Sequence, residues 1–206
     1  FTERTAALPI LIFSLYFFLK EKYFHAYLFQ GLGFLIHPLS SIYLAAILLV
    51  SSVFHLRQIG IRRFAGCIAL FIILISPLLI WKILNGPGGS LLHADLRWVD
   101  LLRLRSPHHI FPFSWKWKEF IRAGLTLVVF FISLKYKPSL FHHQVMVCSL
   151  MTILFLCAVG TIFTEFLRVP AVIQLQFFRG SLFFIYFNLV YYDNYFMVAI
   201  EKGSSG

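Results

Sequence analysis

Charged side chains, and acidic ones above all, are scarce in this chain of 206 residues. They make up 13% of it, whereas an ordinary soluble domain has about 25%. Eight acidic residues stand against 18 basic ones, which gives a net charge of +10 with neutral histidines. No carboxylate pair has a spacing that calls for general acid–base catalysis, and no Ser-His-Asp order, phosphate-binding loop or dinucleotide-binding loop is present. The sequence therefore assigns no catalytic residue.

Cysteine is also rare, and metal-ligand spacing is missing. The three cysteines stand in apolar runs without a CxxC pair, so they are interpreted as small hydrophobic residues rather than disulfide or zinc partners. The histidine pairs 108–109 and 142–143 each lack a further histidine three or four positions earlier. A metal site needs three or four convergent ligands, so we predict neither a metal nor a cofactor.

Apolar and aromatic residues are abundant instead. Hydrophobic residues make up 60% of the chain and aromatic residues 18%, including 25 phenylalanines. So many phenylalanines do not fit in one soluble core of this size, and lipid is the simplest solvent for them. Basic residues at the ends of membrane spans meet lipid phosphates. Since no basic soluble domain is present, we predict membrane lipids and no nucleic acid as partners.

Seven apolar runs approach the length of about 20 residues that a transmembrane helix needs. Pro38 separates two of them, because proline removes a backbone donor and clashes with the preceding turn. We predict an all-α integral membrane protein of about seven transmembrane or half-membrane helices, forming a single transmembrane domain over 1–202. The runs cover residues 5–19, 23–36, 39–54, 64–84, 119–134, 145–165 and 171–197.

The distribution of basic residues predicts the orientation. If seven segments alternate, the compact clusters at 20–22, 57–63 and 135–137 fall on one side, which the positive-inside rule makes cytoplasmic. The opposite side is not poor in arginine, so this preference is modest. A multi-pass protein of the bacterial inner membrane is expected. Residues 203–206 resemble an expression tag, and the start at Phe1 suggests that an N-terminal part of a larger protein is missing.

The segment 85–118 is expected to be an external loop. It opens with the breaker NGPGGS and continues as LLHADLRWVDLLRLR, whose apolar and polar residues separate at helical spacing. This pattern predicts an amphipathic helix that lies in the membrane interface. Trp115 and Trp117 then mark the headgroup level before the chain enters the membrane again.

The end of this loop carries the first candidate binding residues, Arg105, His108 and His109. Pro107 biases the preceding residue away from helix, so the histidines are expected on a turn. An arginine fork suits a phosphate or carboxylate, and histidines donate hydrogen bonds or shuttle protons. The alternative is that the arginines bind headgroups nonspecifically and the histidines cap a turn.

Three further candidates are His37, Gln176 and Arg179. His37 stands before the proline break, where it either bonds to a freed backbone carbonyl or lines a cavity. In a helix that begins at Pro170, Arg179 lies about 13 Å along the axis, with Gln176 on the same face. A buried arginine is expected to face the bundle or a wet cavity; the alternatives are snorkelling or a pair with Glu165.

Three stretches, GFLIHPLSSIY, RSPHHIFPFSW and LQFFRG, together resemble bacterial membrane proteins related to the GT-C superfamily of glycosyltransferases. This resemblance implies short helices, an interfacial helix in an external loop and a polyprenyl-phosphate-sugar donor at the outer leaflet. The catalytic acid of that superfamily lies in the first external loop, which has no counterpart here unless Glu3 is its remainder. The resemblance therefore carries over no catalytic base.

The function expected from all of this is binding of a lipid-linked phosphosugar or a similar anionic lipid at the outer leaflet. The site would be formed by Arg105, His108, His109, His37, Gln176 and Arg179. Whether the chain is a glycosyl-transferring enzyme is left open. Part of a transporter or flippase, or a structural subunit that contacts other chains, is the alternative.

Overall fold

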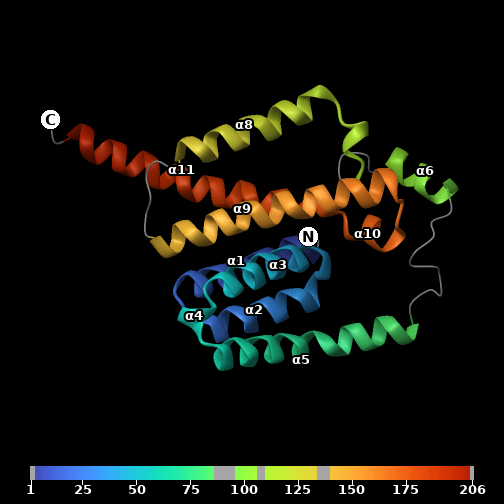
Figure 1. The fold of residues 1–206 in the computed structure, drawn as a ribbon, viewed down its shortest axis with the longest axis horizontal. Helices are drawn as coiled ribbons and strands as arrows, with labels where there is room; N and C mark the ends of the chain where they lie inside the picture. Colours follow the sequence, from blue (N-terminus) through green and yellow to red (C-terminus); the bar gives the residue numbers. More distant parts are fainter. Residues whose placement is uncertain (1–2, 86–95, 106–109, 134–139, 205–206) are drawn as a thin grey trace. The chain divides into compact units, whose positions relative to one another are not determined.

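The computed structural model describes residues 3–85, 96–105, 110–133 and 140–204, and every regular element in these ranges is helical (Figure 1). The all-α prediction is confirmed for this part of the chain. The chain divides into two compact units, residues 1–90 and 91–206, and each is described separately. A single transmembrane domain over 1–202 stays a prediction.

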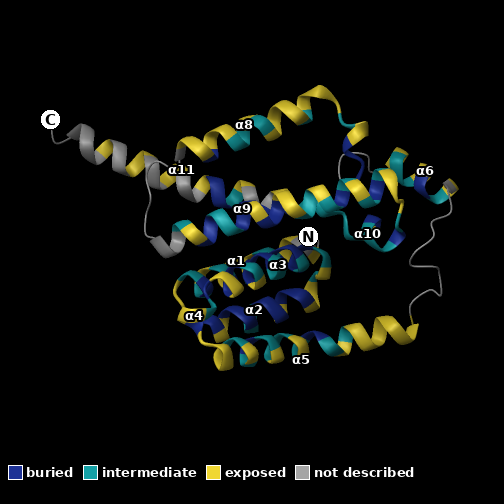
Figure 2. Cartoon of the chain, viewed as in Figure 1, coloured by how far each residue is buried: buried dark blue, intermediate teal, exposed yellow. Residues whose placement is uncertain are grey.

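Unit 1 is a group of helices with α2 at its centre, in which α1 and α3 run against α2 and α5 runs in the same direction as α2 (Figure 1). Helix α2 packs against α1, α3 and α5, and seven of its 14 residues are buried (Figure 2). The helices of this unit are α1 (Glu3–Leu19), α2 (Tyr23–Ile36), α3 (Pro38–Phe54), the short α4 (Leu56–Ile59) and α5 (Ile61–Asn85).

Buried hydrogen bonds hold α1, α2 and α3 together. The side chain of Gln30 has no exposed surface, and its amide donates to both the carbonyl and the hydroxyl oxygen of Ser41 at 2.7 Å each. The hydroxyl of Ser14 donates to the carbonyl of Ala26 at 2.8 Å. Polar side chains that bond across apolar helices are typical of membrane bundles.

Two glycines of α2 allow its neighbours to approach closely. A Cβ on Gly33 would lie 2.5 Å from Cδ2 of Leu11, and a Cβ on Gly31 would lie 2.6 Å from Cδ1 of Leu74. Because real Cβ atoms do not tolerate such distances, α1 and α5 pack where α2 has no side chain. Small residues at helix contacts serve this purpose in membranes.

Unit 2 combines three long helices with several short ones. Helices α8 and α11 run in the same direction and α9 runs against them (Figure 1). The amide of Asn188 in α11 donates to the carbonyl of Thr126 in α8 at 2.7 Å. The elements are α6 (Leu96–Arg105), the 3-10 turn η1 (Pro112–Ser114), α8 (Trp117–Ser133), α9 (Leu140–Thr161), the π-helical turn η2 (Ile162–Phe166), α10 (Pro170–Leu175), the 3-10 turn η3 (Phe177–Gly180) and α11 (Ser181–Ser204).

The helix expected to continue from Pro170 through Arg179 is interrupted, so this prediction was wrong. Helix α10 ends at Leu175, Gln176 adopts a left-handed φ of 48°, and Arg179 lies in η3. The turn allows Phe177 to pack on α9, since its Cβ lies 3.2 Å from the position of a Cβ built on Gly160. This packing favours a tight turn over one continuous helix.

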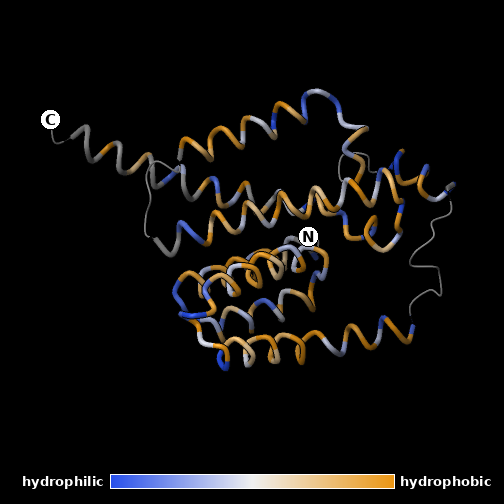
Figure 3. The backbone as a smooth tube through the Cα atoms, viewed as in Figure 1, coloured by the Kyte–Doolittle hydropathy of each residue, from blue (hydrophilic) through white to orange (hydrophobic). Residues whose placement is uncertain are grey.

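Two described stretches, Ile61–Asn85 and His143–Phe166, are long and apolar enough to cross a membrane. Figure 3 shows the hydrophobic residues that dominate α5 and α9. Only 11% of the most apolar window of Ile61–Asn85 is buried, against 39% for His143–Phe166. The apolar helices α1 and α3, with 17 residues each, are shorter.

Candidate functional site

Short elements gather at one end of the long helices of unit 2. We call residues 96–105, 110–119 and 162–180 the polar end. Its core is a cluster of four residues, Val99, Ile110, Phe111 and Ile173, each at most 2% exposed. These side chains come from α6, from the chain before η1 and from α10. The side of α6 that carries Val99, with the partly buried Trp98 and Leu102, therefore packs against this unit, whereas Leu101 and Leu104 are exposed.

An ion pair fastens α6 to the end of α9. Nη2 of Arg103 lies 2.8 Å from Oε2 of Glu165, and Oε1 of Glu165 accepts the backbone N–H of Phe113 at 2.9 Å. The guanidinium carbon of Arg103 also lies 4.8 Å from the ring centre of Phe111. Both oxygens of Glu165 are engaged, so this carboxylate joins three elements and is not a free base.

The backbone around Glu165 departs from the α-helix. Residues Ile162–Phe166 form a π-helical turn, and Arg168 just after it has a left-handed φ of 52°. The hydroxyl of Thr164 donates to the carbonyl of Ile110 at 3.2 Å, which ties the turn to the chain before η1. π-helical turns and left-handed residues other than glycine are frequent at functional sites.

The structure brings Gln176 and Arg179 together. The backbone N–H of Arg179 in η3 donates to the carbonyl of Gln176, the residue just before η3, at 2.8 Å, and both residues are half-buried. The neighbouring ring of Phe178 lies 5.0 Å from the ring of Trp115, measured between centres. Arg179 is therefore held in a turn that contacts the chain just before α8.

The other four predicted site residues are not shown to lie beside Gln176 and Arg179. Arg105 is exposed at the last position of α6. His108 and His109 lie outside the described residues. His37 belongs to unit 1, where its Nδ1 accepts the backbone N–H of Ser40 at 3.1 Å and caps α3. The convergence of all six candidates on one cavity stays a prediction.

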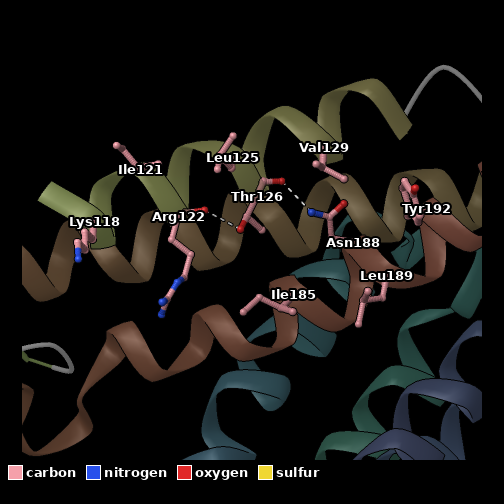
Figure 4. Close-up of a pocket in the computed structure, with 10 residues that line it drawn as sticks. All are labelled: Lys118, Ile121, Arg122, Leu125, Thr126, Val129, Ile185, Asn188, Leu189 and Tyr192. Atoms are coloured by element: carbon pink, nitrogen blue, oxygen red, sulfur yellow. Dashed lines mark hydrogen bonds between the residues drawn. The ribbon is translucent and has the colours of Figure 1, made fainter.

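A groove between α8 and α11 was not anticipated from the sequence. It has a volume of about 620 Å³ and carries two basic residues, Lys118 and Arg122, near the start of α8 (Figure 4). Their spacing of four residues places both on one face of the helix. This spacing is the one feature of the sequence that could have indicated a basic site here. The remaining wall is mostly apolar and is formed by Ile121, Leu125, Val129, Ile185, Leu189 and Tyr192.

Neither a metal site in the described part of the chain nor a known family is indicated for this protein. Within the described ranges, no group of three or more His, Cys, Asp or Glu side chains is arranged to hold a metal ion. No protein-family model, no curated protein and no solved structure matches the chain. Its function must therefore be inferred from its own residues.

Proposed function

We propose that this chain is a multi-pass membrane protein that binds a lipid-linked phosphosugar or a similar anionic lipid at the outer leaflet. The observation that carries the proposal is the position of the polar end. It gathers arginines and three tryptophans, Trp98, Trp115 and Trp117, at one end of the apolar helices α8, α9 and α11. At a membrane surface, the basic side chains of the polar end would lie at the level of anionic lipid headgroups.

Helix length and exposure support the membrane location. At 1.5 Å per residue, the 25 residues of α5 extend about 38 Å, more than the roughly 30 Å of a hydrocarbon core. Its apolar side chains are largely uncovered, including Ile73, Ile80 and Ile83. The shorter helices would then be half-membrane or tilted segments. In total, about seven transmembrane or half-membrane helices would lie in a bacterial inner membrane.

Charge supports an anionic ligand. The polar end has seven basic and three acidic residues, and the most buried carboxylate, Glu165, is already paired with Arg103. In a low-dielectric surrounding, an arginine fork binds phosphate bidentately. Arg105 and Arg179 are the proposed phosphate-binding residues, with Gln176 as a neighbouring hydrogen-bonding group. His108 and His109, which Ser106 and Pro107 separate from Arg105 in sequence, also belong to the proposed set.

Glycosyl transfer of the GT-C type is the enzymatic form of this proposal and is supported by the three short motifs quoted above. The engaged state of Glu165 leaves it unsuited as a general base. By the GT-C resemblance, the catalytic carboxylate would be Glu3, as the remainder of the first external loop, or would come from another part of the protein. The alternatives are a part of a transporter or flippase, which binds the same lipid without chemistry, and a structural subunit, which binds none.

Native mass spectrometry with added polyprenyl phosphate tests the proposal. We expect wild-type protein to retain the lipid and Arg179→Gln to lose about tenfold or more in retention, while Arg179→Lys keeps part of it because its charge remains. Arg62→Gln removes an exposed cation from unit 1 and serves as the control. Equal retention in wild type, Arg105→Gln and Arg179→Gln would refute the lipid-phosphate proposal.

A further inference from the structure

A polar contact joins the two helices that form the groove, α8 and α11. Asn188 is 6% exposed and donates to the carbonyl of Thr126, which joins the first half of α11 to the middle of α8 (Figure 4). The hydroxyl of Thr126 in turn donates to the carbonyl of Arg122 at 2.8 Å. This contact therefore helps to set the spacing of α8 and α11 along the groove.

The length of the groove corresponds to one leaflet. From Lys118 to Val129, the α8 wall covers eleven residue steps, or about 17 Å at 1.5 Å per residue. Half of a hydrocarbon core is roughly 15 Å thick. A chain that lies along this wall, with its head at Lys118, would therefore reach approximately the middle of the bilayer.

The charge of the groove is confined to one end. Lys118 and Arg122 lie one helical turn apart, and none of the described residues that line the groove carries a carboxylate. Trp115 and Trp117 come immediately before Lys118, at the level where aromatic residues mark the membrane interface. The groove is thus basic where headgroups are expected and apolar where acyl chains are expected.

We propose that this groove holds one acyl chain of a resident anionic glycerophospholipid, whose phosphate lies between Lys118 and Arg122. The groove uses Lys118 and Arg122 rather than Arg105 and Arg179, and the proposal rests on the proposed membrane location but not on the phosphosugar site. A bound lipid of this kind would cover apolar surface that α8 and α11 leave open. Its negative charge would also offset the two neighbouring cations.

The test measures how many lipids the purified full chain retains in a neutral detergent with added phosphatidylglycerol or phosphatidylcholine. We expect wild type to retain more phosphatidylglycerol than phosphatidylcholine. One basic residue near a membrane surface contributes about a fivefold change in binding. The double variant Lys118→Gln/Arg122→Gln is therefore expected to lose about 25-fold. Arg62→Gln/Arg63→Gln removes the same charge from an exposed pair in unit 1 and should change little.

A second pair of variants tests the apolar part of the groove without changing charge. Leu125→Trp places a large side chain in the groove, whereas Val128→Trp places it on an exposed part of α8 outside the lining. We expect only Leu125→Trp to reduce phosphatidylglycerol retention. Equal effects of the two tryptophans, or equal effects of the two charge-removing doubles, would overturn the proposal.

The outcome also separates this proposal from the proposed function. If the groove variants lose phosphatidylglycerol but keep polyprenyl phosphate, the resident-lipid site is supported and the phosphosugar site is unaffected. If wild type keeps polyprenyl phosphate but shows no preference for phosphatidylglycerol, only the resident-lipid site fails. Retention of neither lipid by wild type overturns both.

Discussion

The guanidinium of Arg103 lies 2.8 Å from the carboxylate of Glu165, although 62 residues separate the two along the chain. The side chain of Glu165 is 3% exposed and that of Arg103 is 39% exposed. Since Glu165 also accepts the N–H of Phe113, one carboxylate connects α6, η1 and η2. The position of the polar end relative to α9 depends on this residue.

Replacing Glu165 with glutamine should destabilise the protein. Breaking a fully buried ion pair costs about 3–5 kcal/mol. Because Arg103 is partly exposed, solvent screens this pair and we expect a smaller loss of about 1–2 kcal/mol. Thermal unfolding followed by circular dichroism in detergent measures it. Asp193→Asn, which removes an exposed acid of α11, is the control, and equal melting temperatures of the two variants would contradict the structural role of Glu165.

Gln30→Leu should also lower stability. The substitution removes two hydrogen bonds to Ser41 from a fully buried site. Hydrogen bonds between membrane helices contribute about 0.6 kcal/mol on average and up to about 1.7, so a loss of roughly 1 kcal/mol is expected. The same unfolding assay applies, with Gln58→Leu at an exposed position as the control. If Gln30→Leu has the same melting temperature as the wild type, these hydrogen bonds contribute little to stability.

The two glycine environments predict opposite effects of alanine. At Gly33, the new methyl group would lie 2.5 Å from the buried Leu11, so Gly33→Ala should cost about 1–3 kcal/mol by overpacking. At Gly124 in α8, no heavy atom outside the local helix lies within 4 Å of an added Cβ. There, alanine should stabilise the helix by up to about 1 kcal/mol.

A compensating substitution checks the mechanism at Gly33. Leu11→Ala opens the space that the new methyl group would occupy. The loss measured for Gly33→Ala in the Leu11→Ala background should therefore be smaller than in the wild type. Additive losses in the double variant would mean that the two residues do not interact.

The helices themselves were largely predictable from hydrophobicity and proline. The apolar runs 23–36 and 39–54 correspond to α2 (Tyr23–Ile36) and α3 (Pro38–Phe54), with the break at His37 as expected. This prediction succeeded because proline acts locally, by its fixed φ and missing N–H. The amphipathic pattern before Arg105 likewise corresponds to a helix, α6.

Interactions between distant segments were not predictable from the same rules. Nothing near Arg103 or Glu165 in sequence indicates that they meet, because their pairing follows from how α6 folds back on η2. The break at Gln176 was missed for a similar reason. It depends on Phe177 packing against Gly160, whereas the local sequence VIQLQFFRG is compatible with one helix.

The most direct test of the central claim is the side of the membrane on which the polar end lies. In a protein whose three cysteines are replaced by alanine, single cysteines are placed at the exposed positions 105 and 62. A membrane-impermeant maleimide is then added to intact bacterial spheroplasts. The account predicts labelling of Arg105→Cys from outside and of Arg62→Cys only after lysis. Labelling of both from the same side, or recovery of the protein outside the membrane fraction, would contradict it.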